Sequence, residues 1–162
     1  MILARPTPAF AFGHPAHFIA LGFGAGLARV APGTFGTLVA FPLWWLMGGG
    51  YDPLVLLGIL GALFLVGIWA CGRTGRDLGV SDHGAMCWDE VVAFLLVLAL
   101  VPDDWRWQAA AFLLFRLFDV VKPPPIRQLE LRLRGGFGVM FDDILAAGYT
   151  LLVLAVAKRV LF

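Results

Sequence analysis

Long uncharged stretches alternate with short charged segments along the whole chain, and each uncharged stretch is long enough to form a helix. Residues 53–72, PLVLLGILGALFLVGIWACG, are twenty positions without a charge. A helix of about 20 apolar residues crosses a hydrocarbon core of about 30 Å. This stretch therefore predicts a transmembrane helix.

Three further stretches predict shorter helices. Residues 30–51 are uncharged, but VAPGTFGT interrupts them. We therefore expect a helix from about residue 36 to about residue 48, followed by a turn at GGGYDP. Residues 87–101 and 105–121 flank the turn VPDD and predict a helical hairpin.

The last apolar stretch predicts a fifth helix. Residues 144–162 follow an acidic pair and end with Lys158 and Arg159, which is the charge order that a helix dipole favours. No internal repeat or linker interrupts the pattern. The five helices predict an all-α fold, a compact multi-helix integral membrane bundle formed by one domain over residues 1–162.

Composition places this bundle in a membrane. Hydrophobic residues make up 60% of the chain and charged residues only 14%, a balance typical of membrane proteins. The net charge is +1 and the bases are scattered, so no patch that could bind nucleic acid is indicated. Cys71 and Cys87 lie beside apolar stretches, and we expect them to be packing residues rather than a disulfide framework.

The charges predict how the chain is oriented. With five crossings, residues 26–36, 72–89 and 122–143 share one face of the membrane. Most bases lie there, and the positive-inside rule makes this face cytoplasmic. The acids at or near the helix ends on this face are Asp77, Asp82, Asp89, Glu90, Asp119, Asp142 and Asp143. A polar site at the cytoplasmic interface is therefore predicted.

The segment VAPGTFGT, residues 30–37, joins a Pro-Gly turn to a helix start. Its free backbone amides and the hydroxyls of Thr34 and Thr37 could bind an anion, phosphate above all. The alternative is that one of the two threonines only caps the helix. Gly33, Thr34 and Thr37 are therefore candidate phosphate-binding residues, and capping stays open.

The segment SDHGAMCWDE, residues 81–90, places two acids directly before an apolar run. Asp89 and Glu90 suit a helix N-terminus, where one of them could be the cap. Together with Asp82 they also match a hard-cation site built from oxygen ligands, and both interpretations stay open. His83 has no second histidine at a metal-binding spacing, so we expect it to form hydrogen bonds rather than to ligate a metal.

Arg116, Asp119 and Lys122 are spaced by three residues and would lie along one helix face. A ladder of ion pairs within the helix is the structural interpretation. However, Asp119 lies where the helix should end before Pro123, and a carboxylate at a helix C-terminus opposes the dipole unless a cation compensates it. Ionisable groups beside a hydrocarbon phase are also costly, which favours a functional role.

Asp142 and Asp143 form a second acidic pair, which follows the flexible loop GGFG at the predicted start of the last helix. Capping explains one such pair, but two pairs together with Asp119 on one face favour a shared site. Carboxylates accompanied by Lys122 and Arg116 describe a site for Mg²⁺ and a phosphate ester. Phosphoryl transfer needs such positive charge to offset the phosphate oxygens.

Other functions and mechanisms fit the sequence less well. Four residues rather than five separate Cys71 from Arg76, and no DxDx pattern is present, so neither a cysteine phosphatase nor an aspartyl-phosphate enzyme is indicated. Water activated by a metal-bound carboxylate network is the simplest mechanism.

The main alternative function is a small ion or proton transporter, which should carry ionisable groups near the midplane. Residues 53–72 contain none. A structural membrane subunit is the third possibility.

Four segments closely resemble, in their order and spacing, the phosphatidylglycerophosphatase A family: GFGAGLARVAPGTFGTL, DHGAMCWDEVVAF, FRLFDVVKPPPI and GGFGVMFDDILAAG. The resemblance extends from about residue 22 to about residue 148. It implies a helical bundle in the bacterial inner membrane. It also implies Mg²⁺-dependent removal of the terminal phosphate of phosphatidylglycerophosphate, which gives phosphatidylglycerol. A membrane phospholipid is then the expected partner, and the oligomeric state stays open.

The resemblance implies functional weight for Gly33, Thr34, Thr37, Asp82, Asp89, Glu90, Arg116, Asp119, Lys122, Asp142 and Asp143. We expect the metal ligands to be Glu90, Asp119, Asp142 and Asp143. We expect Lys122 and Arg116 to neutralise phosphate, and the hydroxyls of the two threonines to donate to it. Gly33 and Asp82 are counted with the substrate-binding residues, and Asp89 is a further ligand or the general base.

Overall fold

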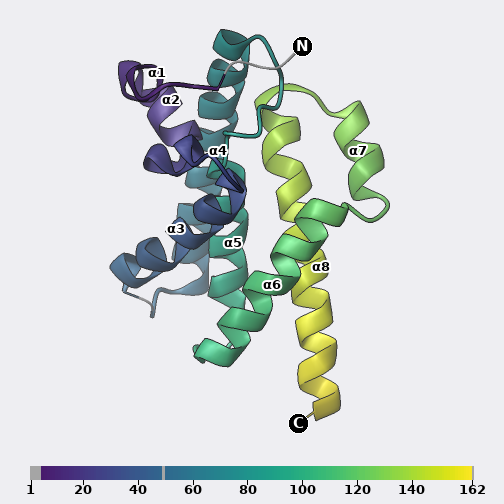
Figure 1. Ribbon diagram of the computed structural model, residues 1–162. Coiled ribbons are helices and arrows are strands. Elements are labelled where there is room, and N and C mark those ends of the chain that lie inside the picture. Colours follow the sequence, from purple (N-terminus) through teal and green to yellow (C-terminus); the bar gives the residue numbers. More distant parts are fainter. Residues whose placement is uncertain (1–4, 49, 162) are drawn as a thin grey trace.

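The regular structure of the described chain is entirely helical (Figure 1). The computed structural model describes residues 5–48 and 50–161, and within these ranges it contains no strand. The predicted all-α fold is therefore confirmed. The elements are α1 (Pro8–Gly13), α2 (Pro15–Ala20), the 3-10 helix η1 (Gly22–Leu27), α3 (Pro32–Met47), α4 (Pro53–Leu78), α5 (Trp88–Leu100), α6 (Trp105–Val121), α7 (Ile126–Arg132) and α8 (Gly135–Leu161).

Helix α5 lies at the centre of the bundle. Residues 91–95 are all buried, so this helix is covered on every side rather than along one stripe. It packs against α3, α4, α6 and α8, and the ring of Phe94 meets that of Phe112 on α6. Cys71 and Cys87 are buried and form no disulfide within the described residues, as expected of packing residues. The N-terminal end of α5 is therefore surrounded by protein.

Helix α4 and the hairpin formed by α5 and α6 agree with the predictions. Helix α4 begins at Pro53, where the carboxylate of Asp52 caps it. It continues past residue 72 and ends at Leu78. Asp104 in the VPDD turn caps α6 in the same way.

Two predicted helix starts are wrong, and both lie in glycine-containing segments. Helix α3 begins at Pro32, one turn before the predicted start, because proline suits the first turn of a helix. Helix α8 begins at Gly135, two turns before Asp143. Glycine has low helix propensity, but a Cβ on Gly136 would overlap the carbonyl oxygen of Ile68 on α4. The GGFG segment is therefore a close helix contact and not a flexible loop.

Among the described residues, two helices, α4 and α8, are long and apolar enough to cross a membrane, judged by length and composition alone. The side chains of Leu54, Leu57 and Leu65 on α4 are exposed, as expected of a helix that faces lipid. The remaining three predicted crossings correspond to α3, α5 and α6, which have 16, 13 and 17 residues. These crossings stay predictions.

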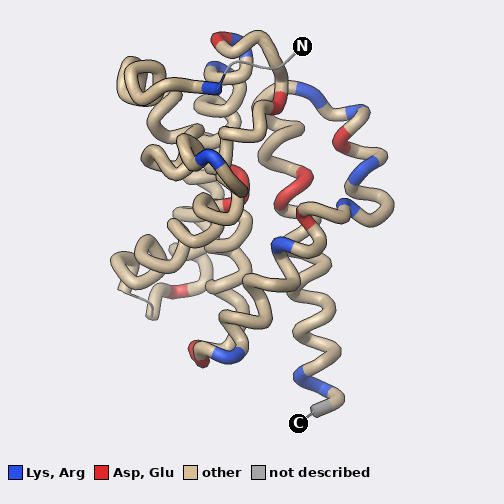
Figure 2. The backbone as a smooth tube through the Cα atoms, viewed as in Figure 1, with Lys and Arg blue, Asp and Glu red and all other residues tan. Residues whose placement is uncertain are grey.

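The sequence pattern did not predict the short elements α1, α2, η1 and α7. Helix α2 is bound to the end of α4, because His17 Nε2 lies 2.8 Å from Asp77 Oδ2. Arg73 Nε, on α4 itself, donates to the same oxygen at 2.8 Å. Helix α7 lies at the edge of the bundle, beside the first turns of α8 (Figure 1). Both segments lie in the same half of the molecule as the acidic positions of α5 and α8 (Figure 2).

Candidate active site

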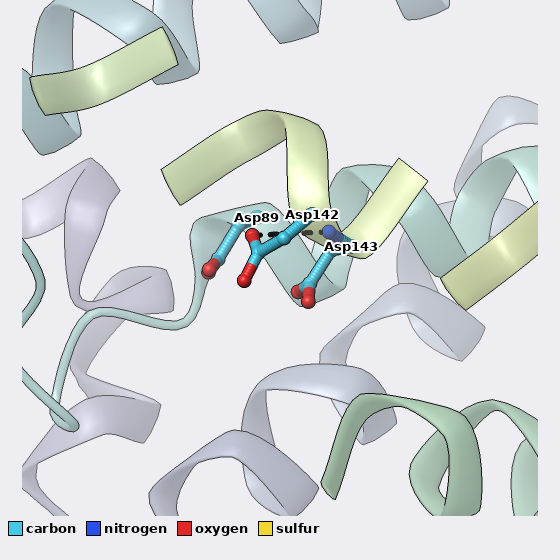
Figure 3. A group of neighbouring side chains, drawn as sticks. All are labelled: Asp89, Asp142 and Asp143. Carbon is cyan, nitrogen blue, oxygen red and sulfur yellow. Dashed lines mark hydrogen bonds between the residues drawn. The ribbon is translucent and has the colours of Figure 1, made fainter. Parts of the chain in front are cut away.

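Five carboxylates from three helices meet beside the N-terminal end of α5. Oxygen atoms of Asp89, Asp142 and Asp143 lie within 4.8 Å of one another, and so do oxygen atoms of Glu90, Asp119 and Asp143. Figure 3 shows the three aspartates of the first group pointing in the same direction. Asp143 belongs to both groups. The structure thus brings together acids that are up to 54 positions apart in the sequence, as predicted.

The acidic pair of α5 does not cap its helix. The N-cap is Cys87, whose side chain makes no capping hydrogen bond to the first turn. Asp89 and Glu90 follow as the second and third residues of the helix, and each is only 8% exposed. The helix dipole favours negative charge at this position. The capping interpretation of this pair is therefore wrong, and both carboxylates face the interior.

The acidic pair of α8 lies inside its helix for a different reason. Because α8 begins at Gly135, Asp142 and Asp143 are two turns from its start and cannot cap it. They are 5% and 2% exposed. Asp142 Oδ1 accepts a hydrogen bond from Asp143 N at 3.1 Å, the dashed line in Figure 3. The early start of α8 thus carries both acids into the bundle.

Three buried carboxylate oxygens have no hydrogen-bond partner among the described residues, namely Asp89 Oδ1, Glu90 Oε2 and Asp143 Oδ2. Burial of an uncompensated charge costs roughly several kcal/mol, and the neighbouring carboxylates repel one another. A donor set made only of oxygen atoms suits a hard divalent cation such as Mg²⁺. The residues therefore fit such an ion, which would supply the partner that these oxygens lack.

Arg116 joins two helices at this cluster. Its Nη1 donates to Asp119 Oδ2 at 2.5 Å and to Glu90 Oε1 at 2.9 Å. The first contact is part of the ion-pair ladder considered for α6. The second reaches across to α5, so Arg116 fixes the relative position of two candidate ligands.

Lys122 binds carboxylates outside α6 rather than the ion-pair ladder considered for that helix. It follows the last residue of α6 in a left-handed conformation, with φ of 46°. Its Nζ donates to Asp142 Oδ2 at 2.7 Å and to Glu130 Oε1 at 2.8 Å. Burial alone would lower the pKa of Lys122, but these two carboxylates raise it above its ordinary value. Lys122 is therefore an ammonium with three N–H donors, and one of them is left for another acceptor.

Glu130 on α7 is a site residue that sequence reasoning missed. It binds Lys122, although Pro123, Pro124 and Pro125 stand between the two residues. Prolines end a helix, so no helical spacing relates Glu130 to Lys122. The only available signal was the presence of one acid in a short segment rich in bases.

Gly33, in the first turn of α3, gives space to the carboxylate of Glu90. A Cβ at this position would overlap Glu90 Oε1 and lie 2.7 Å from its Cδ. Thr37 Oγ1 donates to the carbonyl oxygen of Gly33 at 2.9 Å and so holds this turn. The N-cap is Ala31, which makes no side-chain hydrogen bond, so neither Thr34 nor Thr37 caps the helix. Contacts of these residues with phosphate stay predictions.

The substitution Gly33→Ala is expected to lower turnover by about thirtyfold, because a carboxylate displaced by about 1 Å no longer holds its partners in the reactive geometry. The measurement is kcat for phosphate release. Gly61→Ala is the matched control, since a Cβ on Gly61 in α4 meets nothing within 4 Å. Equal activity of the two variants would contradict a role for Gly33 in placing Glu90.

Asp82 lies outside both groups of carboxylates. It is exposed in the loop before α5 and lines a cavity of about 330 Å³ together with Asp142 and Glu130. Its contact with substrate stays a prediction. The neighbouring His83 accepts a hydrogen bond through Nδ1 from Ala85 N at 3.1 Å. The expected hydrogen-bonding role of His83 is therefore confirmed.

Comparisons with known proteins agree with this geometry. A family model described as Phosphatidylglycerophosphatase A matches residues 18–158. The phosphatidylglycerophosphatase A of Haemophilus influenzae is 44% identical over 141 residues, which are 86% of this chain and 86% of the relative. That of Escherichia coli is 43% identical over 138 residues, which are 82% of this chain and 77% of the relative.

A further relative carries a different name. It comes from Bacteroides thetaiotaomicron, is provisionally named a phosphatidylinositol-3-phosphatase, and is 39% identical over 150 residues, which are 88% of this chain and 93% of the relative. No solved structure matches the chain significantly. The relatives cover most of the chain, and the family model includes all of the acids that meet at α5. The chain therefore belongs to the phosphatidylglycerophosphatase A family.

Proposed function

We propose that this phosphatase hydrolyses the terminal phosphate monoester of phosphatidylglycerophosphate, giving phosphatidylglycerol and inorganic phosphate. The observation that carries the proposal is a group of five carboxylates, four of them buried and that of Asp119 partly buried, flanked by Arg116 and Lys122. Three of its oxygens have no hydrogen-bond partner among the described residues. Two relatives that are named for this activity match the chain over 86% and 77% of their own length. Chemistry and family membership therefore support the same reaction.

Mg²⁺ is the cation that we propose for the cluster. Its ligands would be Glu90, Asp119, Asp142 and Asp143, whose oxygens fall into the two groups described above. When bound, Mg²⁺ offsets the negative charge of the phosphate oxygens in the transition state. The contact of Arg116 with two of these ligands orients them for this purpose.

The side chains of the protein hold the phosphate and move the proton. The third N–H of Lys122 donates to a phosphate oxygen. Asp89 Oδ1 is buried and has no hydrogen-bond partner in the part of the chain that the structure describes. It accepts a proton from the water whose oxygen attacks phosphorus. The bond between phosphorus and the glycerol oxygen breaks, and its electron pair stays on that oxygen. This oxygen then takes up the proton that Asp89 accepted from the water, so Asp89 returns to its carboxylate form.

The reaction is proposed to take place at the cytoplasmic side of the bacterial inner membrane. The apolar surfaces of α4 and α8 would lie in lipid. Bases gather on α7 and around the first turns of α8, in the half of the molecule that contains the acids (Figure 2). The positive-inside rule assigns this end to the cytoplasm.

The experiment that tests the proposed reaction is phosphate release from three lipids in neutral detergent micelles with Mg²⁺ present. The lipids are phosphatidylglycerophosphate, phosphatidic acid and phosphatidylinositol 3-phosphate. The expected kcat/KM for phosphatidylglycerophosphate is at least about tenfold above that for either of the others. Faster release from phosphatidylinositol 3-phosphate would assign the protein to that substrate instead.

A further inference from the structure

A charged cavity of about 330 Å³ is lined by Asp142 of the first carboxylate group and by no other member of either group. Asp142 is almost completely buried and forms the inner part of its lining. Arg127 on α7 and Arg134 directly before α8 are exposed and form its outer part. Asp82 closes a further side. The cavity therefore leads from exposed bases to a proposed metal ligand.

The two arginines of this cavity are available to a ligand. Within the described ranges, neither Arg127 nor Arg134 forms an ion pair with a carboxylate, whereas Arg73, Arg116 and Lys122 do. Two of the acids that line the cavity, Glu130 and Asp142, form ion pairs with the ammonium of Lys122 instead. Arg127 and Arg134 thus line the cavity and have no carboxylate partner among the described residues.

We propose that Arg127 and Arg134 form a subsite for the phosphodiester of the lipid substrate. This inference rests on the proposed function, because phosphatidylglycerophosphate carries a diester phosphate as well as the terminal monoester. A glycerol unit separates the two phosphates. When the monoester lies beside Asp142, the glycerol lies along the cavity and the diester reaches the guanidinium groups at its outer end.

The chemistry of arginine suits this role. A guanidinium binds a phosphate through two parallel N–H···O contacts and stays charged at any physiological pH. Phosphatidic acid has a single phosphate and cannot occupy both ends of the cavity. The subsite therefore selects lipids whose headgroup carries a second phosphate. The cluster of acids recognises only the reacting monoester, so the subsite adds to the specificity for the substrate.

The test is the double variant Arg127→Gln/Arg134→Gln in neutral detergent micelles. We expect KM for phosphatidylglycerophosphate to rise about tenfold with kcat within about twofold of wild type. Hydrolysis of phosphatidic acid is expected to be unchanged. Binding of phosphatidylglycerol gives a readout without turnover, because this lipid keeps the diester but lacks the monoester. Its dissociation constant is expected to rise by the same factor.

The matched control is Arg132→Gln, because Arg132 is also an exposed base of α7 but does not line the cavity. It should change none of these values. Wild-type affinity of the double variant for phosphatidylglycerol would overturn the subsite. An equal loss in Arg132→Gln, or an equal loss with phosphatidic acid, would do so too, since general attraction of anionic lipid would then explain the effect. If wild type binds phosphatidylglycerol through the two arginines but does not hydrolyse phosphatidylglycerophosphate, the subsite stands and the proposed reaction fails.

Discussion

The substitution Asp143→Asn is expected to lower kcat for phosphate release from phosphatidylglycerophosphate by about a thousandfold, or ~4 kcal/mol. Asp143 is the one residue that belongs to both groups of carboxylates, and its Oδ2 has no partner within the described chain. Asparagine keeps the size of the side chain but removes the charge. The measurement is steady-state phosphate release in micelles at saturating Mg²⁺.

The stability of the same variant separates a functional acid from a structural one. Without divalent ions, Asp143→Asn should unfold at a higher temperature than wild type, because one of several mutually repelling buried charges is removed. Addition of Mg²⁺ should stabilise wild type, by about 2.7 kcal/mol at a hundred times the dissociation constant. It should stabilise the variant much less.

Asp52→Asn is the control for this comparison. Asp52 caps the N-terminal end of α4, and asparagine caps a helix about as well as aspartate does. Activity and stability should therefore stay close to those of wild type. If Asp143→Asn lost stability in the absence of Mg²⁺, its carboxylate would be a structural element, and the assignment as a ligand would be wrong.

Removal of divalent ions with EDTA is expected to abolish at least about 99.9% of the wild-type activity, and excess Mg²⁺ should restore it. The reason is that the proposed ligands bring several negative charges close to a dianionic phosphate, and only a cation makes this approach favourable. The measurement is phosphate release from phosphatidylglycerophosphate before and after readdition of Mg²⁺.

Replacing Mg²⁺ with Ca²⁺ in this experiment tests whether the activity depends on the charge of the cation or on its coordination geometry. Ca²⁺ carries the same charge but prefers longer bonds to oxygen, about 2.3–2.6 Å against about 2.0–2.1 Å for Mg²⁺. It should therefore raise the unfolding temperature of wild type but support slower turnover than Mg²⁺. Undiminished phosphate release in EDTA would rule out the proposed role of the carboxylates as metal ligands.

The convergence of the acids could be predicted from the sequence because each of them stands at the end of an apolar stretch. Asp89, Glu90 and Asp119 lie at helix ends that the hydrophobic pattern places on one face. The structure agrees, since α5 and α6 form the predicted hairpin. These charges stand out in the sequence because the stretches beside them are apolar.

Pro32 is a local signal for the start of α3 that the neighbouring glycines obscured. The start of α8 could not be predicted, because the glycines there act through contacts that are distant in sequence. Gly33 is needed for the space that Glu90 occupies, and Gly136 for the approach of Ile68 on α4. Local propensity indicates a turn in both segments, whereas tertiary packing favours a helix. The ion pair between Lys122 and Glu130 could not be predicted either, because the run of prolines between the two residues leaves them without a helical spacing.

One side chain, Asp143, is common to two triads of oxygen donors. If a cation binds to each triad, both cations share the carboxylate of Asp143. A cation bound at one triad then lowers the affinity of the other triad for its own cation. Thermodynamic linkage makes this antagonism reciprocal. A titration with Mg²⁺ should then be more gradual than that of two independent positions, with one tightly held cation and one that exchanges readily during turnover.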